Sequence, residues 1–249
     1  MPRAEKPESE DYEFIGKNLF FPKHGILVFG DMHIGYETML RQSGILVPER
    51  QVKDIIEEVK KVLGIIKKKG HETKKIVFLG DLKHAFGFNY SEKNEFQEVF
   101  EFLGEIFPQE NIILIKGNHD TIDYTFEGMM KKFHIEKNIA FIHGDRKIKE
   151  AFNPEIKFVV HGHLHPCLIL AESPKQEAFK CFLVGKHKNK TFIVMPSYLD
   201  IIEGTPVNEY EENYVESFSV VPKKDIMHFK IHAIGSNKIY DFGEIRDFN

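Results

Sequence analysis

Three short apolar runs, each followed at once by glycine and a polar residue, constrain the fold of this chain more than any other feature. The runs are residues 25–29 before Gly30-Asp31, residues 74–79 before Gly80-Asp81, and residues 111–116 before Gly117-Asn118. Continuous apolar runs of this length are typical of strands that are buried on both faces of a sheet. Each strand is therefore expected to end where polar chemistry begins.

Two segments with helical spacing separate these runs. Pro48 opens the first segment and Gly70 ends it, while the second ends before Pro108. Their apolar positions are Val52, Ile55, Ile56, Val59, Val62 and Leu63 in the first, and Phe96, Val99, Phe100, Leu103 and Phe107 in the second. Strands that alternate with helices predict right-handed crossovers and a largely parallel sheet, with the binding site outside the carboxyl ends of the strands.

The pattern changes after Lys137, where short strands follow one another with little helix between them. The segments are 138–145, 156–166, 178–187 and 190–197, with a further alternating stretch at 228–234. The last two of the four favour a hairpin that turns at Lys188-Asn189, and 228–234 is expected to be an edge strand. This part of the chain therefore predicts a second, more antiparallel sheet in an α/β protein.

Composition limits the domain count and the class of partner. A chain of 249 residues with 42% apolar content can bury one full core. We expect a single domain over residues 1–249, with the motifs in 25–166 and the second sheet completed by 167–249, without a separate cap domain. A formal net charge of −4 argues against a surface that neutralises a long polyanion throughout.

The cysteines and the apolar runs indicate a compartment. Cys167 and Cys181 are too few for a disulfide framework and lack the paired spacing of a zinc knuckle. No apolar run approaches the roughly 18 residues that a membrane span needs. A cytoplasmic protein without a membrane partner is the expectation.

Five separated segments supply side chains with the chemistry of metal ligands. They are Asp31-x-His33, Gly80-Asp81, Gly117-Asn118-His119-Asp120, His143-Gly144-Asp145 and Gly162-His163-Leu164-His165. A single Asp or Asn at such a position more often caps a helix or forms a turn. Side chains two residues apart in extended chain point the same way, however, as is expected of the pairs Asp31/His33 and His163/His165. Together the five segments favour metal binding.

The ligand types and their number indicate two ions. A mixed nitrogen and oxygen set without thiolate suits Mn²⁺, Fe, Zn²⁺ or Ni²⁺ better than Ca²⁺. Seven potential ligands exceed what one ion would use while leaving room for a substrate. Paired divalent ions can generate a hydroxide at neutral pH and clamp the attacking and leaving oxygens of a displacement at phosphorus.

In this order, the five segments resemble the calcineurin-like metallophosphoesterase superfamily. The stretches are GDMHIGYE at 30–37, LGDLKH at 79–84, KGNHD at 116–120, IHGD at 142–145 and HGHLHP at 161–166. They look most similar to small prokaryotic phosphoesterases related to the nuclease subunit of the double-strand-break repair complex. The resemblance implies two facing mixed β-sheets flanked by helices, a four-layer sandwich.

The resemblance also implies roles for individual residues. Asp31, His33 and His165 would hold one ion, and Asn118, His143 and His163 would hold the other, with Asp81 bridging the two. His119 would sit beside the phosphate and stabilise the transition state or protonate the leaving oxygen, with Asp120 fixing its tautomer. The ions would be Mn²⁺ most readily, and Fe, Zn²⁺ or Ni²⁺ as alternatives.

The resulting expectation is a binuclear phosphoesterase that hydrolyses phosphodiester or phosphomonoester bonds, of nucleotides or short nucleic acid, by attack of a metal-bridging hydroxide. Two alternatives stay open, a metal-dependent nuclease acting on DNA or RNA ends and a non-catalytic metal-binding scaffold of the same fold. Many relatives have a carboxylate where this chain has His84, so a role for His84 beside the metal ligands stays open. Tyr36 and Arg41 could contact substrate or pack in the loop, and His161 is interpreted as a buried structural histidine.

Overall fold

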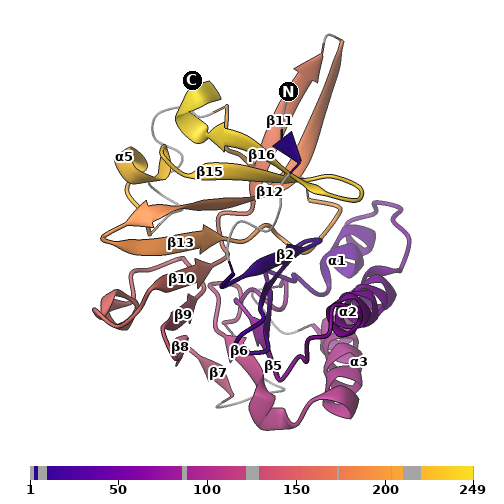
Figure 1. Ribbon diagram of the computed structural model, residues 1–249. Helices are drawn as coiled ribbons and strands as arrows, with labels where there is room; N and C mark the ends of the chain where they lie inside the picture. The colour runs from indigo at the N-terminus through magenta and orange to yellow at the C-terminus, as the bar shows by residue number, and fades with distance from the viewer. Residues whose placement is uncertain are drawn as a thin grey trace.

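The protein is described here from a computed structural model (Figure 1), which covers residues 3–4, 10–85, 89–121, 129–172, 174–202, 204–209 and 220–248. Among these residues no helix combines the length and apolar character that crossing a membrane requires. Cys167 and Cys181 are both buried and unbridged.

The first sheet holds the three apolar runs and their parallel partners. Its order is β2 (Glu13–Ile15), β3 (Asn18–Phe21), β4 (Ile26–Phe29), β5 (Lys75–Phe78), β6 (Ile112–Ile115) and β7 (Met130–Lys131). Strands β4 to β7 are parallel, whereas β2 and β3 run as an antiparallel hairpin at one edge. Phe29 pairs with Phe78 in register, so the carboxyl ends of β4 and β5 lie level with each other.

Helices connect these parallel strands on one side of the sheet. They are α1 (Tyr36–Gln42), α2 (Gln51–Lys68), α3 (Tyr90–Ile106) and the single turn η1 (Gln109–Asn111). The buried side of α2 carries Ile55, Val59, Val62 and Ile66. This is the three-to-four-residue spacing of a helix that packs one apolar stripe on a sheet. Figure 1 shows α2 and α3 lying side by side.

Within the part of the chain that the structure describes, the second sheet contains ten strands of mixed direction. They are β1 (Arg3–Ala4), β8 (Phe133–Glu136), β9 (Ile139–Ile142), β10 (Phe158–His161), β11 (Pro166–Glu172), β12 (Lys175–His187), β13 (Lys190–Val194), β14 (Thr205–Pro206), β15 (Lys230–Ile234) and β16 (Ile239–Glu244). The main path runs β1-β16-β15-β12-β13-β10-β9-β8, with β11 paired to β12 and β14. Short helical turns cover its outer side at η2 (Lys149–Phe152), α5 (Lys223–Ile226) and η3 (Ile245–Phe248).

Two sequence-based expectations meet different outcomes in this sheet. The hairpin turn at Lys188-Asn189 is confirmed, because β12 and β13 pair antiparallel up to His187 and Lys190. Both turn residues have positive φ, 48° and 61°, as a tight two-residue hairpin requires. The expectation of an edge strand at 228–234 is wrong. Strand β15 lies between β12 and β16, and its residues Ile231, His232 and Ala233 are buried.

The inner faces of the two sheets pack on each other and form the central layer of the core. In β4, Ile26 and Val28 point into this layer, whereas Leu27 and Phe29 point to the helices. Strands β9, β10 and β12 of the second sheet supply the opposing residues Phe141, Val160 and Phe182. The expected fold class, α/β with two facing mixed sheets flanked by helices, is confirmed. The expectation that the whole chain is a single domain without a cap stays a prediction.

Phe21 offers a direct test of the inter-sheet core. It is 1% exposed, and its ring meets those of Phe141 and Phe158 from the other sheet at centroid distances of 6.3 and 5.8 Å. Replacing Phe21 by Ala should lower the free energy of unfolding by about 3–5 kcal/mol, because it deletes a buried ring and leaves a cavity. Urea unfolding measures this loss.

The matched control is Ile45→Ala, since Ile45 is 51% exposed and its truncation opens no cavity. A loss below about 1 kcal/mol for Phe21→Ala would contradict the facing-sheet core, because only a poorly packed ring costs so little.

Candidate metal centre

Strand ends from both sheets meet at one edge of the sandwich. Asp31, Asp81 and Asn118 follow β4, β5 and β6 of the first sheet, while His143 and His163 follow β9 and β10 of the second. The backbone ties these ends together, since Met32 and His33 N–H groups donate to the Asp81 carbonyl oxygen. Side chains that are far apart in the sequence therefore come together where the strands stop.

The chain adopts a strained backbone at this edge. Four of the expected ligands have positive φ, namely His33 at 47°, Asp81 at 44°, His163 at 66° and His165 at 48°. Residues other than glycine rarely occupy this left-handed region, and such strain persists where the surrounding structure enforces it. The strained residues are concentrated at the ligand positions. This indicates that the geometry of the site is maintained at a cost in local backbone energy.

Two glycines allow the carboxylates to approach the backbone. A Cβ atom at Gly117 would lie 2.1 Å from Asp81 Oδ1, and one at Gly162 would lie 2.1 Å from Asp31 Oδ1. Since any other side chain would collide with the carboxylate, glycine is required at both positions. The glycines of the sequence motifs thus create the room in which Asp31 and Asp81 sit.

Asp31, His33 and His165 form the first group of potential ligands, with ligand atoms that all lie within 4.8 Å of one another. His165 Nε2 is 2.5 Å from Asp31 Oδ2. Asp31 Oδ1 and both ring nitrogens of His33 are buried without a hydrogen-bond partner. Burial, followed by the neighbouring His165 and His119, lowers the pKa of His33 to about 3, so the ring is neutral at pH 7 and can donate a lone pair to a cation.

Asp81, His143 and His163 form the second group. The Nδ1–H of His143 donates to the Leu79 carbonyl oxygen at 2.9 Å, which fixes the ring. Its Nε2 then faces Asn118 Oδ1 at 3.0 Å and Asp81 Oδ2 at 3.5 Å. Burial and the neighbouring His143 lower the pKa of His163 to about 4, which leaves this ring neutral as well.

The two groups adjoin each other. The backbone N–H of His163, from the second group, donates to Asp31 Oδ2 of the first at 2.8 Å. Asp31 Oδ1 lies 3.8 Å from His143 Nδ1. All seven expected ligands are therefore brought together by the fold.

The electrostatics of the site call for added positive charge. Burial, together with the nearby carboxylates of Asp31 and Asp120, raises the pKa of Asp81 to about 6 against the opposing effect of His143. Burial alone would likewise raise the pKa of Asp31, although His165 and His143 hold it well below its usual range. Buried carboxylates without a Lys or Arg partner are costly unless a cation joins them. The donor set therefore fits divalent metal ions.

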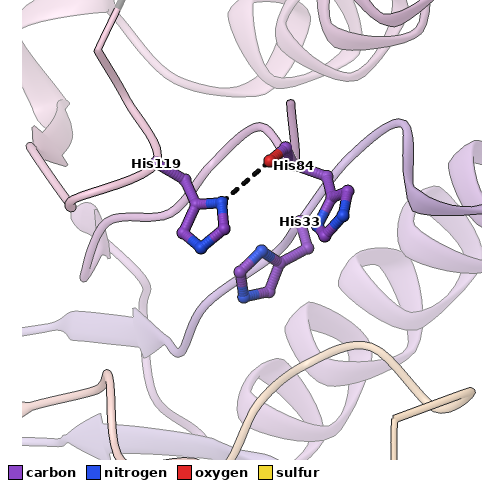
Figure 2. Close-up of side chains that lie close together, drawn as sticks. All are labelled: His33, His84 and His119. Carbon is purple, nitrogen blue, oxygen red and sulfur yellow. Dashed lines mark hydrogen bonds between the residues drawn. The ribbon is translucent and has the colours of Figure 1, made fainter. Parts of the chain in front are cut away.

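His119 lies beside these groups, with its backbone N–H donating to Asp81 Oδ1 at 2.8 Å. Figure 2 shows its ring close to those of His33 and His84, with a hydrogen bond from Nδ1 to the His84 carbonyl oxygen. This bond is 2.8 Å long, and an acceptor carbonyl requires that Nδ1 carries the proton. Chemistry at His119 would therefore be carried by Nε2.

The expected role of Asp120 is corrected by this geometry. Its carboxylate accepts from the backbone N–H groups of Gly117 at 2.9 Å, Leu82 at 3.0 Å and Lys83 at 3.3 Å. Asp120 therefore joins the loops after β5 and β6, and the tautomer of His119 is set by the His84 carbonyl oxygen. Sequence reasoning assigned Asp120 to the wrong partner because a neighbour in sequence need not be a neighbour at the ring.

The residues left open in the sequence have distinct surroundings. The ring of His84 lies against Tyr36 at 4.6 Å and against His119 at 5.6 Å between centroids, and its side chain joins His33 and His119 in a third group of potential ligands. Arg41 forms an ion pair with Glu49 at 2.5 Å. His161 is fully buried against Phe192, as interpreted from the sequence.

Two supporting residues were missed by sequence reasoning. Gln51 Nε2 donates to the His33 carbonyl oxygen at 2.8 Å, and its Oε1 accepts from Gly35 N–H at 3.1 Å. Glu92 accepts from two N–H groups of the loop after β5. Nothing in the sequence marks Gln51, but Asn89-x-x-Glu92 is a recognisable start of a helix, and Asn89 does cap α3.

Structural comparison shows the same fold in a known nuclease. The nuclease MPE of Pseudomonas putida aligns with a TM-score of 0.57 at 15% identity, covering 97% of this chain and 100% of that one. Two further matches are a conserved uncharacterized protein of Streptococcus pneumoniae, described as a predicted phosphoesterase, and a Vps29 single mutant of Entamoeba histolytica. Their identities are 14% and 13%, their TM-scores 0.36 and 0.37, and their coverage 88% of this chain with 97% and 99% of theirs.

Sequence comparison identifies the family. No curated protein sequence matches this chain. The sequence profile of the calcineurin-like phosphoesterases matches residues 24–152. That match spans more than half of the chain and includes Asp31, Asp81, Asn118 and His143. The chain therefore belongs to the calcineurin-like phosphoesterase family and is a metal-dependent phosphoesterase.

Proposed function

We propose that the protein hydrolyses phosphodiester or phosphomonoester bonds of nucleotides, using two divalent ions at the edge where the sheets meet. The observation that carries this proposal is the adjacency of the two ligand groups, Asp31/His33/His165 and Asp81/His143/His163. Two ions a few ångströms apart are what in-line displacement at phosphorus uses.

The proposed ligand sets follow the grouping of the side chains. Asp31, His33 and His165 would hold the first ion, and Asn118, His143 and His163 the second, with Asp81 shared between them. Asp81 Oδ2 faces His143 at 3.5 Å, and its backbone carbonyl receives the N–H groups of Met32 and His33. This double attachment, to one group by side chain and to the other by backbone, supports Asp81 as the bridge.

The mixed carboxylate, amide and imidazole donors favour Mn²⁺, with Fe, Zn²⁺ and Ni²⁺ as alternatives. When bound, such ions activate water at neutral pH and withdraw charge from the phosphoryl oxygens. The protein itself fixes the ring of His143 through Leu79 and keeps the rings of His33 and His163 neutral through burial. Its contribution is a preformed set of lone pairs at fixed positions.

His119 is proposed as the group that assists departure of the leaving oxygen. Its Nδ1–H is bound to the His84 carbonyl oxygen, and its backbone is bound to Asp81. The ring is therefore fixed relative to the proposed bridging carboxylate. With Nδ1–H bound to the carbonyl oxygen, a second proton carried on Nε2 of the imidazolium form would pass to the departing alkoxide and leave the ring neutral.

A nuclease acting on DNA or RNA ends is the second candidate. The likeness of fold to a bacterial nuclease over nearly the whole chain favours it. The net charge of −4 does not favour long duplex DNA, because binding to a duplex depends on many cationic phosphate contacts. Short ends or mononucleotides are the substrates that this charge allows.

The role of His119 is tested by His119→Gln. The substitution should lower kcat by about 10²- to 10⁴-fold on a diester with a poor leaving group, because proton transfer to the leaving oxygen is lost. The bound metal should be unchanged, since His119 is outside both proposed ligand sets. Steady-state kinetics with Mn²⁺, together with metal analysis of the same samples, give both quantities. An unchanged rate would remove His119 from the mechanism.

The two-ion proposal is tested by metal content. Wild-type protein dialysed against Mn²⁺ should retain about two ions per chain, and chelation should abolish hydrolysis until Mn²⁺ is returned. His163→Ala should retain fewer ions, because one of the donors of the second ion is missing. His228→Ala is the control, since His228 is an exposed histidine that bonds to Glu244. Equal metal content in wild type and His163→Ala would contradict the assignment.

Salt dependence separates the two substrate classes. If DNA or RNA ends are the substrate, log KM should rise steeply with log salt, because each phosphate contact releases counterions. If mononucleotides are the substrate, the response should be nearly flat. Activity on oligonucleotides and on cyclic nucleotides between 50 and 200 mM salt measures this difference.

A further inference from the structure

The loop after β5 is held by two carboxylates from other parts of the chain. Four consecutive backbone N–H groups, those of residues 82–85, donate to them. Asp120 receives the first two, and Glu92 of α3 receives His84 N–H at 2.8 Å and Ala85 N–H at 2.7 Å. Glu92 belongs to neither proposed ligand set, yet it is only 4% exposed.

Glu92 stands where a glutamate ordinarily caps its own helix. Asn89 is the N-cap of α3, and its side chain accepts from Ser91 and Glu92 N–H. In a capping box the glutamate three residues later reaches back to the N-cap N–H. Here the carboxylate oxygen Oε1 is instead directed to His84 and Ala85. The Glu92 side chain thus accepts hydrogen bonds from the loop beside the metal centre and not from the N-terminus of its own helix.

The absence of a side chain at Gly35 leaves room for this carboxylate. Gly35 has a φ of 93°, and a Cβ atom there would lie 2.7 Å from Glu92 Cγ and 2.9 Å from Oε1. Glu92 therefore occupies the space that a side chain at position 35 would need. The segment that carries His33 and the loop that carries His84 meet across this carboxylate.

One peptide unit links Glu92 to His119. The N–H of Ala85 and the carbonyl of His84 belong to the same planar group and point in opposite directions when the peptide is trans. Glu92 Oε1 binds the N–H side at 2.7 Å, and His119 Nδ1 binds the carbonyl side at 2.8 Å (Figure 2). Because the peptide group is rigid, fixing its N–H fixes the direction of its carbonyl. A carboxylate on the N–H also polarises the group and strengthens the bond at the carbonyl.

We propose that Glu92 is a positioning residue that orients His119 through the His84–Ala85 peptide group and keeps the Nδ1–H of His119 bonded to the His84 carbonyl oxygen. The inference rests on the function proposed above for His119. Glu92 lies outside both proposed ligand sets and binds the backbone of the loop, so its effect on His119 would pass through the loop. The neutral amide of Gln would bind the Ala85 N–H more weakly and let the peptide group turn, which misplaces the ring.

The closing experiment is a double-mutant cycle of Glu92→Gln with His119→Gln, assayed with Mn²⁺ on a diester with a poor leaving group. With His119 intact, Glu92→Gln should lower kcat by about ten- to a hundred-fold, as a misplaced catalytic group does. With His119→Gln present, it should cost less than about two-fold, because no ring remains to be positioned. Equal losses in both backgrounds would overturn the inference.

A second substrate and a control substitution on the same helix make the double-mutant cycle more specific for the positioning of His119. A 4-nitrophenyl leaving group needs little protonation, so Glu92→Gln should cost less than about three-fold on that substrate. Glu95→Gln is the matched control, since Glu95 is a half-buried glutamate on the same helix α3 but accepts a hydrogen bond from Thr38 of α1. A loss of kcat for Glu95→Gln as large as that for Glu92→Gln would mean that a general loosening of α3 is responsible.

A spectroscopic experiment tests the same inference without turnover of a substrate. Nitrogen NMR of the imidazoles, with His119 assigned from the His119→Gln spectrum, should show the proton on Nδ1 in wild type and a shifted Nδ1 resonance in Glu92→Gln. An unshifted His119 resonance would overturn the inference. Absence of hydrolysis by the wild type would sink the proposed function, and the NMR result would still decide whether Glu92 controls His119.

Discussion

The burial of Asp31 and Asp81 at the junction of the two sheets is the constraint on which the rest of this structure depends. Both carboxylates are almost inaccessible, and burial lowers the pKa values of the neighbouring His33 and His163 to about 3 and about 4. Such an arrangement is unfavourable in isolation, because desolvated negative charge has a large free-energy cost. It becomes favourable when divalent cations supply the missing charge. The burial of these two carboxylates therefore explains why the site calls for divalent cations.

Two features of the backbone near the site accompany the burial of these carboxylates. Four expected ligands have left-handed backbone conformations, and two glycines provide the room for the carboxylates. Strained residues of this kind are retained only where rigid surroundings enforce them. The facing sheets provide those surroundings, because β4, β5 and β9 are fixed by the inter-sheet core up to the residues where the ligands begin. Core packing and site geometry are thus parts of one arrangement.

Sequence pattern was sufficient for the parts of the fold that depend on local periodicity. The uninterrupted runs before Asp31, Asp81 and Asn118 predicted strands with level carboxyl ends, and the parallel order of β4, β5 and β6 follows from the helices between them. The burial of β15 was missed, because alternation in 228–234 does not reveal how many strands lie on either side. An interior place is decided by pairing with β12 and β16, which are distant in sequence.

The candidate site likewise has parts that the sequence predicts and parts that only contacts between distant residues reveal. The residues with metal-ligand chemistry were recognisable from type and spacing, and the fold brings them together. Their supports were not recognisable, since Asp120 and Glu92 act through bonds to the backbone N–H groups of residues 82–85. Backbone partners leave no trace in residue identity. The positioning of His119 could therefore be read only from three-dimensional contacts.

The most direct test of the central claim is anomalous diffraction from crystals soaked in Mn²⁺. Two peaks about 3.5–4 Å apart are expected, one among Asp31, His33 and His165 and the other among Asn118, His143 and His163, with Asp81 touching both. A single peak, or density remote from these side chains, would contradict the account of a two-ion centre at the junction of the sheets.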